Sequence, residues 1–145
     1  MEKNYDMLKL ENQLCFPLYA CSREIVKKYH PHLDEIGLTY TQYIVMMVMW
    51  EKKHVSVKEL GEKLYLDSGT LTPVLKSLES KGLVTRTRSS EDERVLIVGI
   101  TDEGESLKEQ AAEIPPKIAC CVALSPEEAG TLYKLLYKTL GNESA

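Results

Sequence analysis

The residues of this chain with the greatest chemical reactivity are four cysteines, at positions 15, 21, 120 and 121. No two of them have the C-x-x-C spacing of a zinc site, and the three histidines add no repeat that would complete one. The sequence therefore predicts neither a metal site nor a cofactor. What remains for these thiols is oxidation, in which a thiolate attacks a peroxide, or packing as a small apolar side chain.

Cys15 has the surroundings that best suit a reactive thiolate. Asn12 suits a helix N-cap, which puts Cys15 in the opening turn of a long helix, where free backbone N–H groups favour the thiolate. Tyr19 follows one turn later on the same face. Tyr29 and Tyr40 flank the break between the first two long helices, and their phenols are candidate donors to the sulfur. The spacing leaves a second interpretation open, in which Cys15 is a buried small hydrophobe.

Helices that position these residues are marked by their first residues. Residues 44–50 are apolar on all sides and predict a buried helix. Capping-box pairs mark three helix starts, and a threonine followed by two acids marks a fourth: Thr39 with Gln42, Ser56 with Glu59, Ser125 with Glu128, and Thr101.

The middle of the chain has the pattern of a helix-turn-helix followed by a β-hairpin. A short helix after Ser56 is broken at 65–68, and a second helix over 69–81 ends at Gly82. Two β-prone segments, 83–88 and 95–100, are joined by a charged turn. The predicted fold is mainly α with a small β wing, a winged helix-turn-helix.

The second helix and the wing carry side chains suited to DNA. In this kind of unit the start of the second helix enters the major groove, and an arginine at the wing suits a narrow minor groove. A proline near the helix start is expected to remove no needed hydrogen bond. Protein contact is the alternative use, but the joint occurrence of these features favours DNA. The candidate DNA-binding residues are Ser68, Thr70, Thr72, Pro73, Lys76, Arg86, Asp92 and Arg94.

The flanking segments predict dimerisation. With 145 residues the chain has room for one domain, 1–145, in which the winged part occupies about 39–101. Helices over about 8–35 and 102–140 have apolar faces, and one recognition helix reads only half a site. We therefore expect an obligate homodimer on a pseudo-palindromic double-stranded DNA operator.

Composition excludes other classes. A chain that is 43% hydrophobic and 28% charged is neither disordered nor membrane-spanning, and without a secretory signal it is expected in the cytoplasm. The net charge of −4 is uneven, being zero over residues 1–57, +2 over 58–90 and −6 over 91–145. Only the middle part, residues 58–90, has the net positive charge that favours contact with phosphate.

Four segments together resemble the organic hydroperoxide resistance regulators, which are peroxide-sensing repressors of the multiple antibiotic resistance regulator (MarR-type) superfamily. The resemblance runs from about residue 8 to residue 140. The segments are LCFPLYA at 14–20, LTYTQY at 38–43, YLDSGTLTP at 65–73 and DER at 92–94.

The resemblance implies a homodimeric repressor that leaves its operator when organic hydroperoxides oxidise Cys15. Tyr29 and Tyr40 match the tyrosines that hydrogen-bond the sensing sulfur, and Asp92 with Arg94 matches the wing pair. In one branch a small thiol captures the sulfenic acid, and in the other a cysteine of the partner subunit does so. The segment 114–120 resembles the one that carries this resolving cysteine, so Cys120 is the candidate and Cys121 the substitute.

Further expectations concern the neighbours of Cys15 and competing functions. Apolar residues 14, 16, 18 and 46 are expected to favour organic over hydrogen peroxide, and Cys21, on another helix face, is expected to pack. A MarR-type repressor released by a phenolic or antibiotic-like ligand is the alternative regulator. An enzyme is not expected, because a thiol peroxidase would need a recycling dithiol such as C-x-x-C and would leave the winged unit without a purpose.

Overall fold

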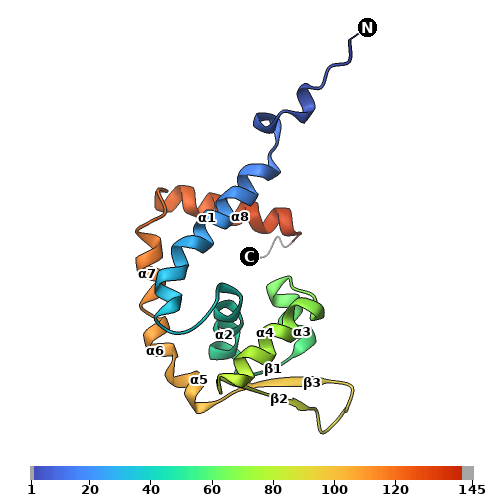
Figure 1. The fold of residues 1–145 in the computed structure, drawn as a ribbon, viewed down its shortest axis with the longest axis vertical. Coiled ribbons are helices and arrows are strands. Elements are labelled where there is room, and N and C mark those ends of the chain that lie inside the picture. The colour runs from blue at the N-terminus through green and yellow to red at the C-terminus, as the bar shows by residue number, and fades with distance from the viewer. Residues whose placement is uncertain (1, 142–145) are drawn as a thin grey trace. The chain divides into compact units, whose positions relative to one another are not determined.

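The computed structural model describes residues 2–141 (Figure 1). The chain divides into two compact units, the first ending at Ile114 and the second beginning at Pro115. In the first unit the elements are η1 (Asp6–Leu8), η2 (Leu10–Asn12), α1 (Cys15–Asp34), α2 (Tyr40–Lys52), β1 (His54–Ser56), α3 (Val57–Leu64), α4 (Ser68–Ser80), β2 (Val84–Arg88), β3 (Leu96–Ile100), α5 (Asp102–Ser106) and α6 (Lys108–Ala111). The boundary falls at the start of α7 (Ile114–Ala119), which α8 (Pro126–Leu140) follows.

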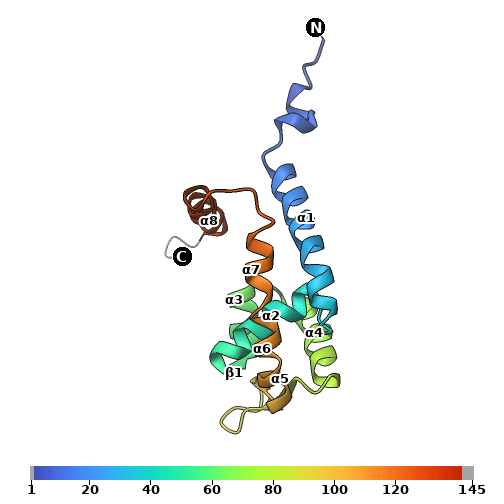
Figure 2. The ribbon, with the colours of Figure 1, turned by 90° about the vertical axis from the view of Figure 1, so that its left-hand side faces the viewer.

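Helix α1 begins at Cys15, but Asn12 is not its cap, so that prediction is wrong. Asn12 lies in η2, and its side chain donates a hydrogen bond to the Asp6 carbonyl at 2.7 Å. Asparagine side chains readily bond to nearby backbone groups, and here the Asn12 amide bonds to the backbone of η1 instead of capping α1. Leu14 occupies the N-cap position instead. The first half of α1 stands clear of α2, α3, α4 and the sheet (Figures 1 and 2).

Helix α2 forms the centre of the core, as its apolar sequence predicts. Thr39 and Gln42 form the complete capping box at its start. Seven of its 13 residues are buried, and Met47 is the large apolar residue that is exposed, with 46% of its surface open. At the other end, the Trp50 indole donates to the Gly104 carbonyl at 2.8 Å, which fixes α2 against α5.

The helix-turn-helix consists of α3 and α4, within one residue of the predicted bounds. Ser56 and Asp67 cap the two helices through their side chains. Tyr65 ends α3 in the left-handed region, with φ 56°. Gly61 is required by the closeness of the turn, since a Cβ there would lie 2.6 Å from the Leu66 carbonyl oxygen.

The wing is the antiparallel hairpin of β2 and β3, with Val84 opposite Ile100 and Arg88 opposite Leu96. A third strand, β1, pairs with β3 and gives the order β1-β3-β2. The sequence analysis did not predict β1, because three residues are too few to show an alternating pattern. The mainly helical fold with a small β wing is confirmed.

The second unit ends in α8, where Ser125 and Glu128 form the predicted capping box and Gly141 ends the helix with φ 90°. Much of the apolar surface of α8 is exposed in the single chain, at Leu132, Tyr133, Leu135, Leu136 and Leu140. Over residues 2–141, no helix combines the length and the apolarity that crossing a bilayer requires.

Candidate functional site

The start of α4 presents a row of exposed polar groups. Asp67 caps the helix, and its Oδ1 accepts a hydrogen bond from the Thr70 backbone N–H at 2.7 Å. This bond, and after it one from the Thr70 side chain, holds the pKa of the Asp67 carboxyl below its ordinary value. The predicted DNA-binding residues on this helix are all exposed: Ser68, Thr70, Thr72, Pro73 and Lys76.

Two of these residues differ in detail from expectation. The Thr72 hydroxyl donates to the Ser68 carbonyl at 2.8 Å, so its proton is already used and its oxygen remains as an acceptor. Pro73 lies inside α4 rather than in its first turn. A residue there would normally donate to the carbonyl of Gly69, so the expectation that Pro73 removes no needed bond is wrong.

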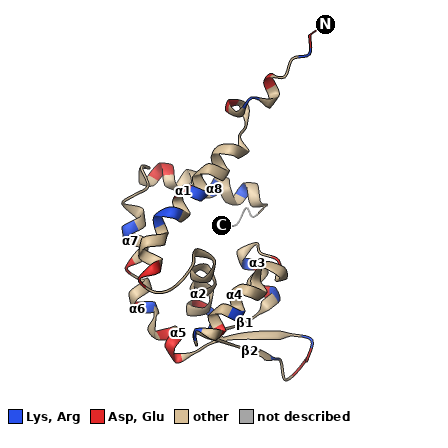
Figure 3. Ribbon diagram, viewed as in Figure 1, with Lys and Arg blue, Asp and Glu red and all other residues tan. Residues whose placement is uncertain are grey.

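The wing carries the arginine–aspartate pair that the sequence predicts. Asp92 accepts two side-chain bonds from Arg94, at 3.1 Å from Nε and 3.2 Å from a terminal nitrogen, and a third from its backbone N–H at 3.0 Å. The side-chain bonds first, and then the backbone bond, lower the pKa of Asp92. The Arg94 side chain is 91% exposed on the charged loop of the wing, drawn in Figure 3.

Arg86 has a different environment from Arg94. It lies on β2 and bonds through a terminal nitrogen to the Glu79 carboxylate of α4 at 3.1 Å. Its side chain is only 21% exposed, so the structure gives it a part in joining the wing to α4. Arg88, two residues on, is exposed.

A groove of about 960 Å³ lies between the helix-turn-helix and the loop end of the wing, where β3 begins. Sequence reasoning did not name Lys58 and Tyr65 as candidate DNA-binding residues, because a lone surface lysine and a turn tyrosine carry no motif. The groove is lined by Lys58, Tyr65, Ser68, Thr72 and Arg94, among others. Helix α4, the recognition helix of this unit, and Arg94 of the wing therefore open onto one continuous surface.

Cys15 is the first residue of α1 and is exposed. Leu14 at the N-cap position has no side-chain acceptor, so the side chain there does not compete for the first backbone N–H groups. Tyr19 lies one turn along and stacks under the Arg23 guanidinium, 5.5 Å from the ring centre. The predicted first-turn position of Cys15 is confirmed, and its packing as a buried hydrophobe within this chain is excluded.

Tyr29 and Tyr40 form an edge-to-face pair with ring centres 5.0 Å apart. Tyr43, buried beneath them, lies 5.8 Å from Tyr29 and 6.2 Å from Tyr40. Burial raises the pKa of Tyr29 and Tyr40, so both phenols keep their protons and remain donors at neutral pH. Tyr29 is fourteen residues after Cys15 on one continuous helix, which at 1.5 Å per residue separates them by about 21 Å.

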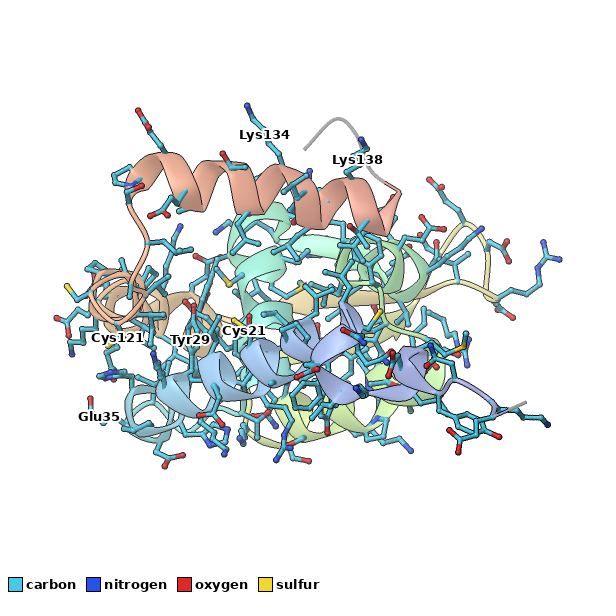
Figure 4. The ribbon with its side chains drawn as sticks, turned by 90° about the horizontal axis from the view of Figure 1, so that it is seen from above. Cys21, Tyr29, Glu35, Cys121, Lys134 and Lys138 are labelled. Carbon is cyan, nitrogen blue, oxygen red and sulfur yellow. The ribbon has the colours of Figure 1, made fainter. Side chains whose placement is uncertain are left out.

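The other cysteines are also exposed. Cys21 lies on the same helix as Tyr29 (Figure 4) and is not packed within the chain, contrary to expectation. Cys120 and Cys121 follow the end of α7, and the Cys121 Sγ lies 3.5 Å from the Lys117 carbonyl oxygen. Within residues 2–141 the His, Cys, Asp and Glu side chains form no group of three or more that could hold a metal ion.

Comparisons with known proteins agree with this geometry. The family model described as transcriptional regulator SarA/Rot matches residues 27–111. The organic hydroperoxide resistance transcriptional regulator of Bacillus subtilis (strain 168) is 50% identical over 97% of this chain and 95% of its own length. The regulator SarZ of Staphylococcus aureus (strain USA300) is 46% identical over 85% of this chain and 83% of its own.

Solved structures of AbfR, a protein of Staphylococcus epidermidis, are similar as well. Reduced AbfR bound to DNA has a TM-score of 0.78 at 37% identity, and covers 94% of each chain. Disulfide-formed AbfR has a TM-score of 0.67 at 36% identity, and covers 93% of this chain and 95% of its own.

The helix-turn-helix, the wing and these matches define a winged-helix transcriptional regulator. The chain belongs to the family that includes the organic hydroperoxide resistance regulator, SarZ and AbfR. The family resemblance that the sequence motifs indicate is confirmed.

Proposed function

We propose that this regulator is a homodimeric DNA-binding repressor that leaves its operator when organic hydroperoxides oxidise Cys15. The observation that carries the proposal is the position of Cys15, exposed at the first turn of α1, about 21 Å along the same helix from the Tyr29–Tyr40 pair. If the phenols of Tyr29 and Tyr40 donate hydrogen bonds to a Cys15 sulfur, that sulfur must therefore belong to a second copy of the chain.

The DNA-binding part rests on the exposed start of α4 and on the wing. Ser68, Thr70 and Thr72 face solvent where a major groove would lie, and Lys76 adds a charge one turn later. Asp92 holds Arg94 in the bidentate geometry that fixes a guanidinium for insertion into a minor groove. The structure of reduced AbfR, a relative at 37% identity, was solved bound to DNA, which supports DNA binding by this chain.

The homodimer is supported by apolar surface that the single chain leaves open. Leu8, Leu10 and Leu14 near the N-terminus are 59–80% exposed. The second unit contributes the apolar face of α8 described above. Exposed apolar surface of this extent marks an interaction site, and a two-fold dimer would bring two recognition helices to a pseudo-palindromic operator.

Oxidation begins with attack of the Cys15 thiolate on the terminal oxygen of the hydroperoxide. The O–O bond breaks, sulfur is oxidised to a sulfenic acid, and the alkoxide takes a proton to leave as the alcohol. Leu14, Phe16 and Leu18 are exposed near the thiol and supply an apolar surface for the organic group. Met46, also expected there, is buried completely in the core and takes no part.

A thiol of the partner then resolves the sulfenic acid, with Cys120 the first candidate and Cys121 the second. The S–O bond breaks, an S–S bond forms, and the hydroxyl leaves with the thiol proton as water. A disulfide holds its two Cα atoms about 4.4–6.8 Å apart, so its closure forces the dimer helices to move. That movement takes the two wings out of register with successive grooves.

Non-reducing gels after treatment with cumene hydroperoxide test the mechanism. The wild type should give a covalent dimer, and Cys15→Ser should abolish it. Of Cys120→Ser and Cys121→Ser, the variant that removes the resolving thiol should also abolish it. Crosslinking that persists in both Cys120→Ser and Cys121→Ser would exclude these two cysteines as resolving residues. Release of DNA by salicylate-like aromatics, but not by hydroperoxide, would favour the alternative regulator.

A further inference from the structure

Gln42 is a polar side chain buried to 6% exposure at the junction of α2 and α4. Its Nε2 donates to the Ser77 hydroxyl of α4 at 2.9 Å. Its Oε1 accepts from the Thr39 backbone N–H at 3.0 Å and from the Lys81 Nζ at 2.9 Å. One amide therefore joins the first turn of α2 to the last turn of the recognition helix.

Lys81 extends this connection to the turn between α1 and α2. Its Nζ also donates to the Gly37 carbonyl at 2.6 Å. Gly37 has φ 71° and lies in the short link after α1. We call Gln42, Ser77 and Lys81 the polar clamp, because together they fix both sides of the α1–α2 turn to the end of α4.

The tyrosine pair lies between α1 and α2, beside the turn that the clamp holds. Tyr29 belongs to the second half of α1, and Tyr40 is the first residue of α2, two positions before Gln42. Their rings meet across the α1–α2 turn. A change in the angle between these helices must therefore alter the contact between the rings, and it must also strain or shift the clamp.

The clamp acts on the end of α4 that is opposite to the DNA-reading residues. Thirteen helical residues span about 20 Å, so a small rotation at Ser77 and Lys81 displaces the start of the helix appreciably. The Gln42 amide is buried, so it becomes costly when it loses its partners, and this favours the arrangement in which Ser77 and Lys81 bond to it. An apolar side chain would pack at position 42 without imposing this choice.

We propose that Gln42 is a positioning residue which, through Ser77 and Lys81, transmits the state of the tyrosine pair to the recognition helix. The inference rests on the proposed function, since it concerns how oxidation at Cys15 reaches the DNA. In the reduced protein the clamp holds α4 at the angle that fits the major groove of the DNA. Movement of the tyrosines on oxidation turns α2 and carries α4 with it.

The test compares two clamp variants, Gln42→Met and Lys81→Met, with the wild type. The probe is duplex DNA selected from random sequence by the reduced wild-type protein, and its Kd is measured before and after cumene hydroperoxide. The readout is the ratio of the oxidised Kd to the reduced Kd. We expect this ratio to fall about tenfold in both variants, within the usual range of allosteric coupling. The rate of Cys15 oxidation, followed by mass spectrometry, should not change.

Two controls separate transmission from stability. Lys53→Met breaks the ion pair with Glu105 at the other end of α2 and should keep the wild-type ratio. Gln42→Glu keeps an acceptor for Lys81, and the Ser77 hydroxyl can donate to it, so it should restore the coupling. Because Lys81 is exposed, Lys81→Met decides the matter if Gln42→Met does not fold.

An unchanged ratio in Lys81→Met, with a large ratio in the wild type, would overturn the role of the clamp and leave the proposed function intact. A wild-type ratio near one would instead refute the proposed function, and the inference would fall with it.

Discussion

Arg94 and Arg86 lie on the same hairpin, but their side chains have different surroundings. The guanidinium of Arg94 extends into solvent and is held only by Asp92. That of Arg86 is largely covered and bonds to Glu79 of the recognition helix. Exposure and partner, rather than residue type, therefore separate a group available to DNA from one that supports the fold.

Substitution of Arg94 should mainly weaken DNA binding, whereas substitution of Arg86 should mainly lower stability. Arg94→Ala should raise the Kd for operator DNA by about 10- to 100-fold, because an inserted guanidinium is lost. Arg86→Met should lower the free energy of unfolding by about 1 kcal/mol, with a smaller change in Kd. Fluorescence anisotropy and urea unfolding measure the two quantities. A larger loss of binding in Arg86→Met than in Arg94→Ala would contradict these assignments.

At the scale of elements, the cap of the recognition helix should depend on pH. The hydrogen bonds from Thr70 lower the pKa of Asp67 in the folded state. The stabilisation is therefore complete above the unfolded value of about 4 and is lost as pH falls through the lower folded value. The advantage of the wild type over Asp67→Ala in urea unfolding should stay constant down to about pH 5 and shrink below about pH 4. Asp67→Asn, whose amide also caps, should show no such change.

The turn of the helix-turn-helix should reject any side chain at position 61. A Cβ on Gly61 would meet the backbone of Leu66, which has no flexible end that can move aside. Gly61→Ala should lower the free energy of unfolding by about 1–3 kcal/mol, against the usual helix preference for alanine. The neighbouring Glu62→Ala, on the exposed face of α3, is the control. Equal stability of the two variants in urea unfolding would show that the turn can relax.

The sequence predicted those elements whose signals are local. Capping residues such as Thr39 and Ser125 act within one helical turn, so their pattern is visible in the chain itself. The pairing of Arg86 with Glu79 and the clamp between Gln42 and Lys81 join residues that only the fold brings together. For the same reason the sequence could place Tyr29 and Tyr40 beside a break but could not show that their rings touch across it.

At the scale of the whole molecule, mixed dimers can establish which copy supplies the tyrosines. One copy carries Cys15→Ser, and the other carries Tyr29→Phe with Tyr40→Phe. If the tyrosines serve the cysteine of the partner, the remaining Cys15 has both phenols and should react with cumene hydroperoxide at the wild-type rate. Stopped-flow kinetics or timed thiol labelling of the mixed dimer gives this rate. Reaction at the slower rate of the tyrosine variant homodimer would place the site within one chain.

The length of α1 has a further consequence for how the regulator responds. A single unbroken helix holds Cys15 and Tyr29 apart, so no folding of an isolated chain can bring them together. Under the proposed function, the complete peroxide-reactive centre, with its two phenols, then forms only on association and is lost on dilution below the dissociation constant of the dimer. Newly made chains would react with peroxide only slowly until they dimerise, so the cellular amount of the protein would set a threshold for sensing as well as for repression.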